Sequence, residues 1–337
     1  MAVGSVTSGI LTSHIIERIG RGQLLRYTSF GLMAGLALVL FGHSAVFTLI
    51  GAMVCGFSGS TLVQLTGAYL STHHGRFAPR VISEQHALAA GIGVIAPLLV
   101  GLTVAQGYGW RPALFVAIGA LLVLEIVRGK STAVYGAVRD EHSEESAHHD
   151  VAGPLPRLYW WAWSGIFCTA AVEFSVMFWA SYVLRDQGGM GKAASAAALG
   201  SAVGGMFVGR FLASQLARTL GSEKLYRASL IIALAGFLVF WRSTSPVVLL
   251  VSLFIAGIGI GGHFPLGLDR VVRASAGRAN KGSAYISLGA GTASGAAPFA
   301  LGALSENIGI QSAYTIVPVA LVLAIYIAFK APVAEIQ

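Results

Sequence analysis

Residues 9–26 read GILTSHIIERIGRGQLLR, a short apolar run that ends in a group of charges and is followed at once by a long apolar run. The charges are Glu17, Arg18, Arg21 and Arg26, with Gly20 among them. This pattern is typical of a membrane hairpin at its charged turn. Only about sixteen residues precede the charges, whereas a bilayer-spanning helix needs about twenty. The sequence therefore predicts that the beginning of this helix is missing upstream.

The composition excludes an ordinary water-soluble protein. Hydrophobic residues make up 55% of the chain and charged residues 11%, against about 25% charged in soluble domains. The mean hydropathy is +0.74. Apolar runs of about twenty residues recur from end to end, which predicts an all-α, polytopic protein of the lipid bilayer. The net charge of +8 lies in short turns, where it sets topology instead of binding nucleic acid.

Hydropathy predicts eleven transmembrane helices. Cys55 and Cys168 lie inside apolar runs, so no disulfide is expected. The predicted helices are 1–16, 24–41, 45–70, 82–106, 111–128, 158–184, 193–217, 224–241, 246–270, 280–304 and 310–330.

Lysine and arginine gather in alternate turns. One side carries only Arg111, Arg185, Lys192 and Arg242. The positive-inside rule therefore places the other, richer side in the cytoplasm and predicts a multi-pass protein of the cell (plasma or inner) membrane with a cytoplasmic C-terminus. The richer side holds Arg18, Arg21, Arg26, Arg76, Arg80, Arg128, Lys130, Arg139, Arg157, Arg218, Lys224, Arg227, Arg270, Arg273, Arg278, Lys281 and Lys330.

The longest polar stretch, residues 128–157, is predicted to be a solvated cytoplasmic linker between two halves. It contains His142, His148 and His149 beside carboxylates, which could bind a metal ion. Clustered polar residues in a linker are more often just solvated, and no fixed ligand spacing is present. We therefore expect no metal and no cofactor.

An internal repeat predicts the architecture. Residues 96–101, APLLVG, return as residues 297–302, APFALG, a shift of 201 positions. The same shift carries Gly20 onto Gly221 and Gly56 onto Gly257. Parallel repeats of this kind occur in transporters built from two bundles. The sequence thus predicts two pseudo-symmetric helical bundles, residues 1–127 (incomplete) and 158–337 (six helices), from a plan of twelve helices whose first would lie upstream of Met1.

With these features the chain resembles the major facilitator superfamily of secondary transporters. The resemblance implies that the turn after the first helix gates the cytoplasmic face, while the residues alone leave open that its arginines only fix orientation. Residues 91–101 also resemble a degraded form of a Gly-Pro helix motif common among exporters. The residues that match the family's loop are Gly9, Leu11, Arg18, Gly20 and Arg21, with Glu17 near the position of its acid and Gly22 in place of its second arginine.

Ionisable residues inside predicted helices are the candidates for binding a solute or a proton, because an unpaired charge in the bilayer is costly. Glu173 leads, with a structural hydrogen bond as the alternative. Arg210 either lines a cavity or extends its charge to the interface, and His263 either titrates or packs as a polar core residue. Gln64 is a weaker polar candidate, and Trp179 either forms an aromatic wall or faces lipid.

Three prolines, Pro97, Pro265 and Pro298, are expected to bend helices, and Gly101 and Gly302 to allow close packing. Asp269, next to Arg270 at a helix end, is expected to pair locally. The glycine run at residues 257–262 is not a nucleotide loop, because it lies inside an apolar helix.

The sequence predicts a secondary transporter and not an enzyme, since no set of nucleophile, base and orienting group emerges. It is expected to move a small solute by alternating access, coupled to protons, with a slight preference for efflux of a small organic or drug-like molecule. Uptake of a sugar or other small polar solute, or a truncated fragment or membrane sensor that transports nothing, stays open. No oligomer is required.

Overall fold

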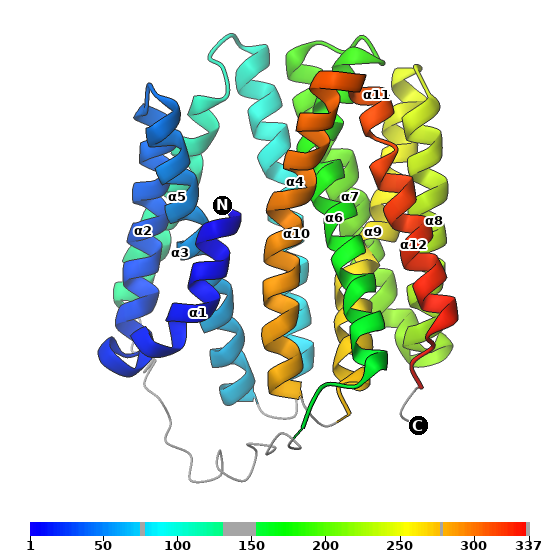
Figure 1. Cartoon of the computed structure of the whole chain (residues 1–337). Helices are drawn as coiled ribbons and strands as arrows, with labels where there is room; N and C mark the ends of the chain where they lie inside the picture. The colour runs from blue at the N-terminus through cyan, green and yellow to red at the C-terminus, as the bar shows by residue number, and fades with distance from the viewer. Residues whose placement is uncertain (75–77, 131–152, 277–278, 335–337) are drawn as a thin grey trace. The chain divides into compact units, whose positions relative to one another are not determined.

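The computed structural model describes residues 1–74, 78–130, 153–276 and 279–334, and all regular structure in these ranges is helical (Figure 1). The all-α fold predicted from hydropathy is confirmed. The helices are α1 (Ala2–Ile19), α2 (Arg21–Phe41), α3 (Ala45–His74), α4 (Ala78–Ala105), α5 (Arg111–Lys130), α6 (Arg157–Asp186), α7 (Lys192–Leu220), α8 (Ser222–Arg242), α9 (Pro246–Ala274), α10 (Ala279–Ile308), α11 (Ile310–Ala313) and α12 (Ile316–Lys330).

The predicted helix at 310–330 is interrupted. Pro318 has no N–H to donate to the carbonyl of Tyr314, so a regular α-helical bond cannot form there. Instead Val317 N–H donates to Tyr314 O over 3.0 Å, and the chain turns between α11 and α12. Each of the other ten predicted helices corresponds to one helix of the structure.

Eight segments among the described residues are long and apolar enough to cross a membrane, and Val3–Thr12 and Gly91–Ala105 are shorter apolar helices. Their outward faces are apolar, for example Val123 at 61% exposure and Val247 at 69%. Lipid is the solvent that such surfaces require, which fits a multi-pass membrane protein.

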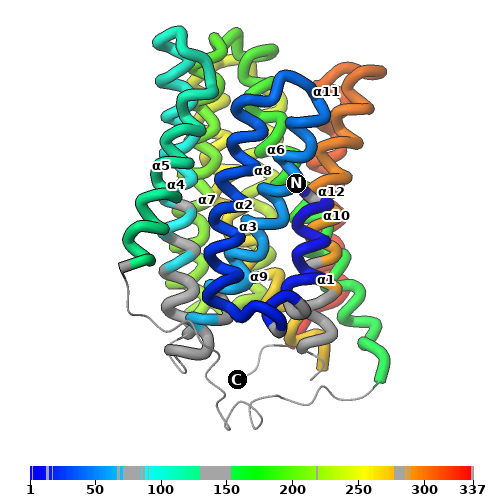
Figure 2. Tube along the Cα trace, turned by 90° about the vertical axis from the view of Figure 1, so that its left-hand side faces the viewer, coloured from blue at the N-terminus to red at the C-terminus, as the bar shows by residue number. Residues whose placement is uncertain are grey.

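The chain divides into two compact units. Unit 1 comprises residues 1–85 and 110–148, and unit 2 comprises residues 86–109 and 149–337. In unit 1, α1, α2 and α3 lie side by side (Figures 1 and 2). In unit 2, α9 contacts α6, α7 and α8, while α6 also contacts α10 and α12. Most of the predicted linker at 128–157 lies outside the described residues.

Helix contacts follow the repeat found in the sequence. A Cβ on Gly4 of α1 would overlap the backbone of Met53 and Phe57 on α3, and a Cβ on Gly205 of α7 would overlap the backbone of Phe254 and Ile258 on α9. Each residue of the second contact lies 201 positions after its counterpart in the first, as in the sequence repeat. The turn glycines Gly20 and Gly221 likewise share a positive φ, +78° and +80°. Each unit therefore contains the same close helix crossing, formed by equivalent residues.

The crossing of α7 and α9 predicts a sharp difference between two adjacent glycines. Gly205→Ala should lower the stability of the protein by about 1–3 kcal/mol, because the new Cβ has to displace backbone. Gly204→Ala is the control, since its Cβ would lie 3.6 Å from the Phe254 ring, an ordinary contact. Thermal unfolding of the two purified variants measures this, and equal melting temperatures would contradict the close crossing.

Candidate functional site

The structure brings together the first two candidates, which lie 37 residues apart in the sequence. Glu173 on α6 and Arg210 on α7 form an ion pair, with Arg210 Nη2 3.6 Å from Glu173 Oε1. Their side chains are 19% and 31% exposed, so both are half-buried. A paired acid and base inside membrane helices is much less costly than either charge alone, and partial exposure leaves the pair open to a ligand.

Each partner is held by a packed helix. Val172 and Val176, on either side of Glu173, are 1% and 0% exposed, so α6 is fixed in rotation there. Gly209, next to Arg210, lies so close to the backbone of Ile258 on α9 that no Cβ would fit. The Arg210 guanidinium therefore extends from a helix that cannot shift easily against α9.

Trp179 lies on α6 beyond Glu173 and contacts α10. Its indole Nε1–H donates to the carbonyl of Pro298 over 3.0 Å. The two residues border a shallow hollow of about 430 Å³, whose other lining residues are Phe178, Ser181, Tyr182, Arg185 and Phe299.

His263 and Gln64 are not part of the charge pair. His263 on α9 is 1% exposed and lies beside the backbone of Ser229 on α8. Gln64 belongs to unit 1, where its amide donates to the Ser8 hydroxyl over 3.2 Å at the crossing of α1 and α3. A role for either residue in binding a solute or a proton stays a prediction.

The three prolines all lie inside helices, Pro97 in α4, Pro265 in α9 and Pro298 in α10. A Cβ on Gly101 would lie 2.6 Å from the Ala197 side chain, and one on Gly302 would lie 2.8 Å from the Trp179 ring. Both glycines thus stand where another helix comes close.

The predicted gating turn joins α1 to α2 through Gly20, whose φ of +78° favours glycine. Gly20 N–H donates to Ile16 O over 2.9 Å and closes α1, and α2 begins at Arg21. Gly9 lies on α1 with open space around it. Neither Arg18 nor Arg21 forms an ion pair with a described side chain, and the side chain of Glu17 lies outside the described ones. Gating by this turn stays a prediction.

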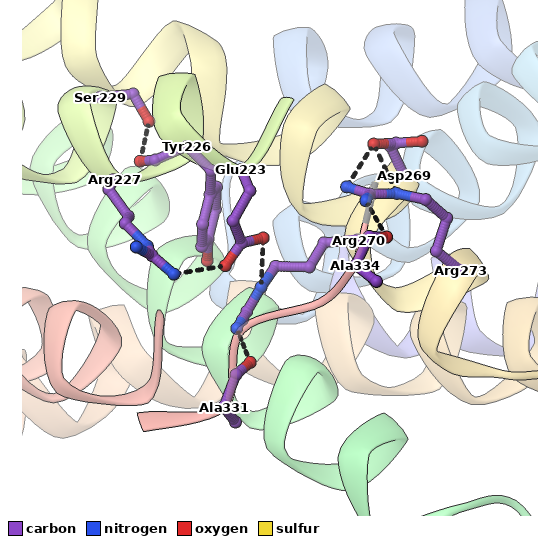
Figure 3. A network of polar contacts seen from close by, with 9 residues as sticks. All are labelled: Glu223, Tyr226, Arg227, Ser229, Asp269, Arg270, Arg273, Ala331 and Ala334. Carbon is purple, nitrogen blue, oxygen red and sulfur yellow. Dashed lines mark hydrogen bonds and ion pairs between the residues drawn. The ribbon is translucent and has the colours of Figure 1, made fainter. Parts of the chain in front are cut away.

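A second charged group, which the sequence did not predict, lies where α8, α9 and the segment after α12 meet (Figure 3). Arg270 is 1% exposed and donates from Nε to Glu223 Oε2 over 3.1 Å. It also donates from Nη2 to the carbonyl of Ala331, beyond α12. Arg227 pairs with the same glutamate at 3.3 Å. One buried carboxylate therefore holds two arginines, and one of these holds the C-terminal segment.

The local pairing expected for Asp269 is confirmed, and its partner is Arg273 and not the adjacent Arg270. Asp269 pairs with Arg273 at 2.9 Å, and Arg273 Nη1 donates to Ala334 O over 2.7 Å. Successive residues on a helix point to different sides, whereas residues four apart share a face. Arg270 therefore turns inward to Glu223. The spacing of four residues could have indicated the pair of Asp269 with Arg273. It could not have indicated the pair of Arg270 with Glu223, which lies 47 residues away in the sequence.

Removal of the Glu223 charge tests the cost of this buried group. Glu223→Gln should destabilise the protein by about 3–5 kcal/mol, because Arg270 would keep its buried charge without a counter-ion. Asp269→Asn is the matched control, since Asp269 is 44% exposed and its pair should contribute at most about 1 kcal/mol. Thermal unfolding in detergent compares the two, and a Glu223 variant as stable as the control would contradict the assignment.

Comparison with known proteins gives a family for this architecture. The sequence model of the Major Facilitator Superfamily matches residues 1–267 and again residues 162–336. The overlap at 162–267 is what a fold of two related halves allows, since the same helices can align with either half. No curated protein matches the chain.

Solved structures show the same fold at low sequence identity. The E. coli fucose:proton symporter FucP superimposes with a TM-score of 0.61 at 15% identity, covering 99% of this chain and 88% of that one. FucP in the outward conformation superimposes with a TM-score of 0.61 at 16% identity, covering 99% of this chain and 87% of that one. The human organic anion transporter MFSD10 (TETRAN) superimposes with a TM-score of 0.65 at 15% identity, covering 97% of this chain and 81% of that one. With apolar helices throughout and equivalent contacts in both units, the protein belongs to the Major Facilitator Superfamily of secondary transporters.

Proposed function

We propose that this protein exchanges protons for a small organic solute by alternating access, with Glu173 and Arg210 as the site where the two meet. The pair carries the proposal, because two sequence-predicted candidates of opposite charge lie together within membrane helices and both side chains are still partly exposed. Membership of a secondary transporter family supplies the general mode of action.

The chemistry of the pair supports coupling. An ionised Glu173 attracts Arg210 strongly in the low dielectric of a membrane protein, whereas a protonated Glu173 has no net charge with which to hold it. A cationic or hydrogen-bonding solute competes with the proton for the same carboxylate. A carboxylate that can hold a proton or a solute, but not both, is sufficient for exchange across a gradient.

Efflux is the direction that we propose, because residues 91–101 of α4 resemble a helix motif of exporters. Uptake together with a proton is the second candidate, and Arg210 favours it. This side chain is the more exposed of the pair, and a protonated Glu173 would free it to bind an anionic solute. Two proteins of similar fold fit that alternative by their names, since FucP is a fucose:proton symporter and MFSD10 is an organic anion transporter.

We further propose that the end of unit 2 with Glu223 and Arg270 faces the cytoplasm, together with the C-terminus, in the cell membrane. The excess of lysine and arginine in the turns at this end supports this orientation.

Proton flux in vesicles tests the role of Glu173. Proteoliposomes that contain the full chain and a pH dye receive an imposed pH gradient and, in separate assays, an organic cation, a carboxylate or a sugar. We expect Glu173→Gln to reduce solute-driven proton flux by roughly 10²-fold, equivalent to about 2.7 kcal/mol. Glu306→Gln, which removes an exposed glutamate of the same unit, should leave the flux unchanged.

The sign of the flux separates the two candidates. Protons that move against the solute indicate exchange, and protons that move with it indicate uptake. Flux in the Glu173→Gln variant equal to that of the unmodified protein would rule out the proposed site. No flux with the unmodified protein for any solute class would favour the sensor or fragment interpretation.

Arg18 tests the predicted gate. Arg18→Ala should slow solute flux roughly fivefold or more, as expected for a coupling free energy of about 1 kcal/mol, while the amount of inserted protein stays the same. Arg26→Ala is the control, because it removes the same charge from an exposed position on α2 outside the family motif. Equal flux in both variants would leave the arginines with a role in orientation alone.

A further inference from the structure

Two tryptophans on α6 contact α10 in the same way. Trp163 donates its indole Nε1–H to the carbonyl of Tyr285 over 2.8 Å. Trp179 donates likewise to the carbonyl of Pro298 over 3.0 Å. Both acceptors are backbone carbonyls inside α10, which lies beside α6 (Figure 1).

Each acceptor is followed four residues later by a glycine against which the same indole packs. A Cβ on Gly289 would lie 2.7 Å from the Trp163 ring. A Cβ on Gly302 would lie 2.8 Å from the Trp179 ring. The arrangement of tryptophan, carbonyl and glycine therefore occurs twice along one pair of helices.

Helix geometry explains why the glycine is needed. The side chain of a helical residue tilts toward the N-terminus and covers the turn before it, so residue i+4 lies over the carbonyl of residue i. That carbonyl already accepts the N–H of residue i+4 and has one lone pair left. Glycine at i+4 uncovers the lone pair and lets a donor from the neighbouring helix reach it.

A third tryptophan supports this explanation. Trp241 on α8 donates to the carbonyl of Gln311 over 2.8 Å. Gln311 belongs to the four-residue helix α11, and the residue four positions on is Thr315. A carbonyl at the end of a short helix is already uncovered, so glycine is not required there.

The two contacts lie on either side of Glu173. Trp163 precedes it by ten residues, about 15 Å along the helix, and Trp179 follows by six residues, about 9 Å. On α10, Pro298 has no N–H and so leaves the carbonyl of Ser294 without its helical partner. Trp179 thus contacts α10 one turn beyond the carbonyl that lacks its helical hydrogen bond.

We infer that Trp163 and Trp179 are positioning residues that join α6 and α10 into one body, so that a displacement of α6 at Glu173 is carried to α10 at Pro298. The inference rests on the proposed function, because Glu173 is taken as the group whose charge changes during transport. Its consequence is that α6 and α10 move together against α7 when the ion pair with Arg210 opens.

Distance measurement by electron paramagnetic resonance tests this in the full chain in lipid nanodiscs. Spin labels go on Glu306→Cys, at the end of α10, and on Thr244→Cys, in the turn after α8, both exposed positions. The native thiols of Cys55 and Cys168 are buried. Neutralisation by Glu173→Gln should shift the distance between the labels by about 2 Å or more.

The same substitution is then made in three further backgrounds. In Trp179→Phe, which keeps a ring but no donor, the shift should fall to half or less. Gly302→Ala, which displaces the ring and keeps the indole, should have the same effect and replaces the first variant if that one does not fold. Trp161→Phe is the control, since Trp161 is exposed on α6 and its indole has no hydrogen bond among the described residues, so the full shift should remain.

An equal shift in the Trp179→Phe and unmodified backgrounds would overturn the inference, and so would the absence of any shift in the unmodified background. Neither result depends on solute flux. If Glu173→Gln abolishes flux but α10 does not respond, the proposed site stands and the joined pair fails. If α10 responds and flux is unaffected, the joined pair stands and the proposed site fails.

Discussion

Close contact between helix backbones is the constraint on which the rest of the structure depends. In unit 2, Gly205 and Gly209 of α7 lie directly against the backbone of α9, and Gly257 and Gly261 of α9 lie against that of α7. Lipid tails are as apolar as the side chains, so burial of apolar surface does not drive helices together inside a membrane. Close backbone contact instead supplies the dispersion attraction that holds the helices together. It also fixes the position from which Arg210 extends.

Two glutamates in the helices of unit 2 pair with arginines near by, which lowers the cost of a charge inside the membrane. Glu173 finds Arg210, and Glu223 finds Arg270 and Arg227. The Arg270–Glu223 pair is more enclosed than the Arg210–Glu173 pair, because Arg270 is 1% exposed whereas Arg210 is 31% exposed. A fully enclosed pair holds structure, and a partly open pair can exchange its partner for a ligand. This difference separates an anchor for the chain end from a candidate site.

Several features could be read from the sequence because they depend on local patterns. The helices follow from apolar runs, and the repeat follows from motifs 201 residues apart, such as those at Pro97 and Pro298. Glu173 and Arg210 could each be chosen, because a charge in an apolar run is costly wherever it lies. Their pairing could not be predicted, since it depends on the rotation of α6 and α7 about their own axes. The helix break at Tyr314 was not predicted, although Pro318 in the sequence indicates that the carbonyl of Tyr314 loses its helical partner.

The sequence by itself determined that this is a helical membrane protein of two related halves, because lipid permits only helices in long apolar runs and a repeated sequence forms a repeated unit. Only the tertiary structure decided which polar groups meet. Arg270 pairs with the distant Glu223, and Trp163 and Trp179 donate to carbonyls that glycines leave uncovered. The physical reason is that hydropathy acts on each segment separately. A hydrogen bond or an ion pair needs two atoms within about 3–4 Å, and only the packing of whole helices sets that distance.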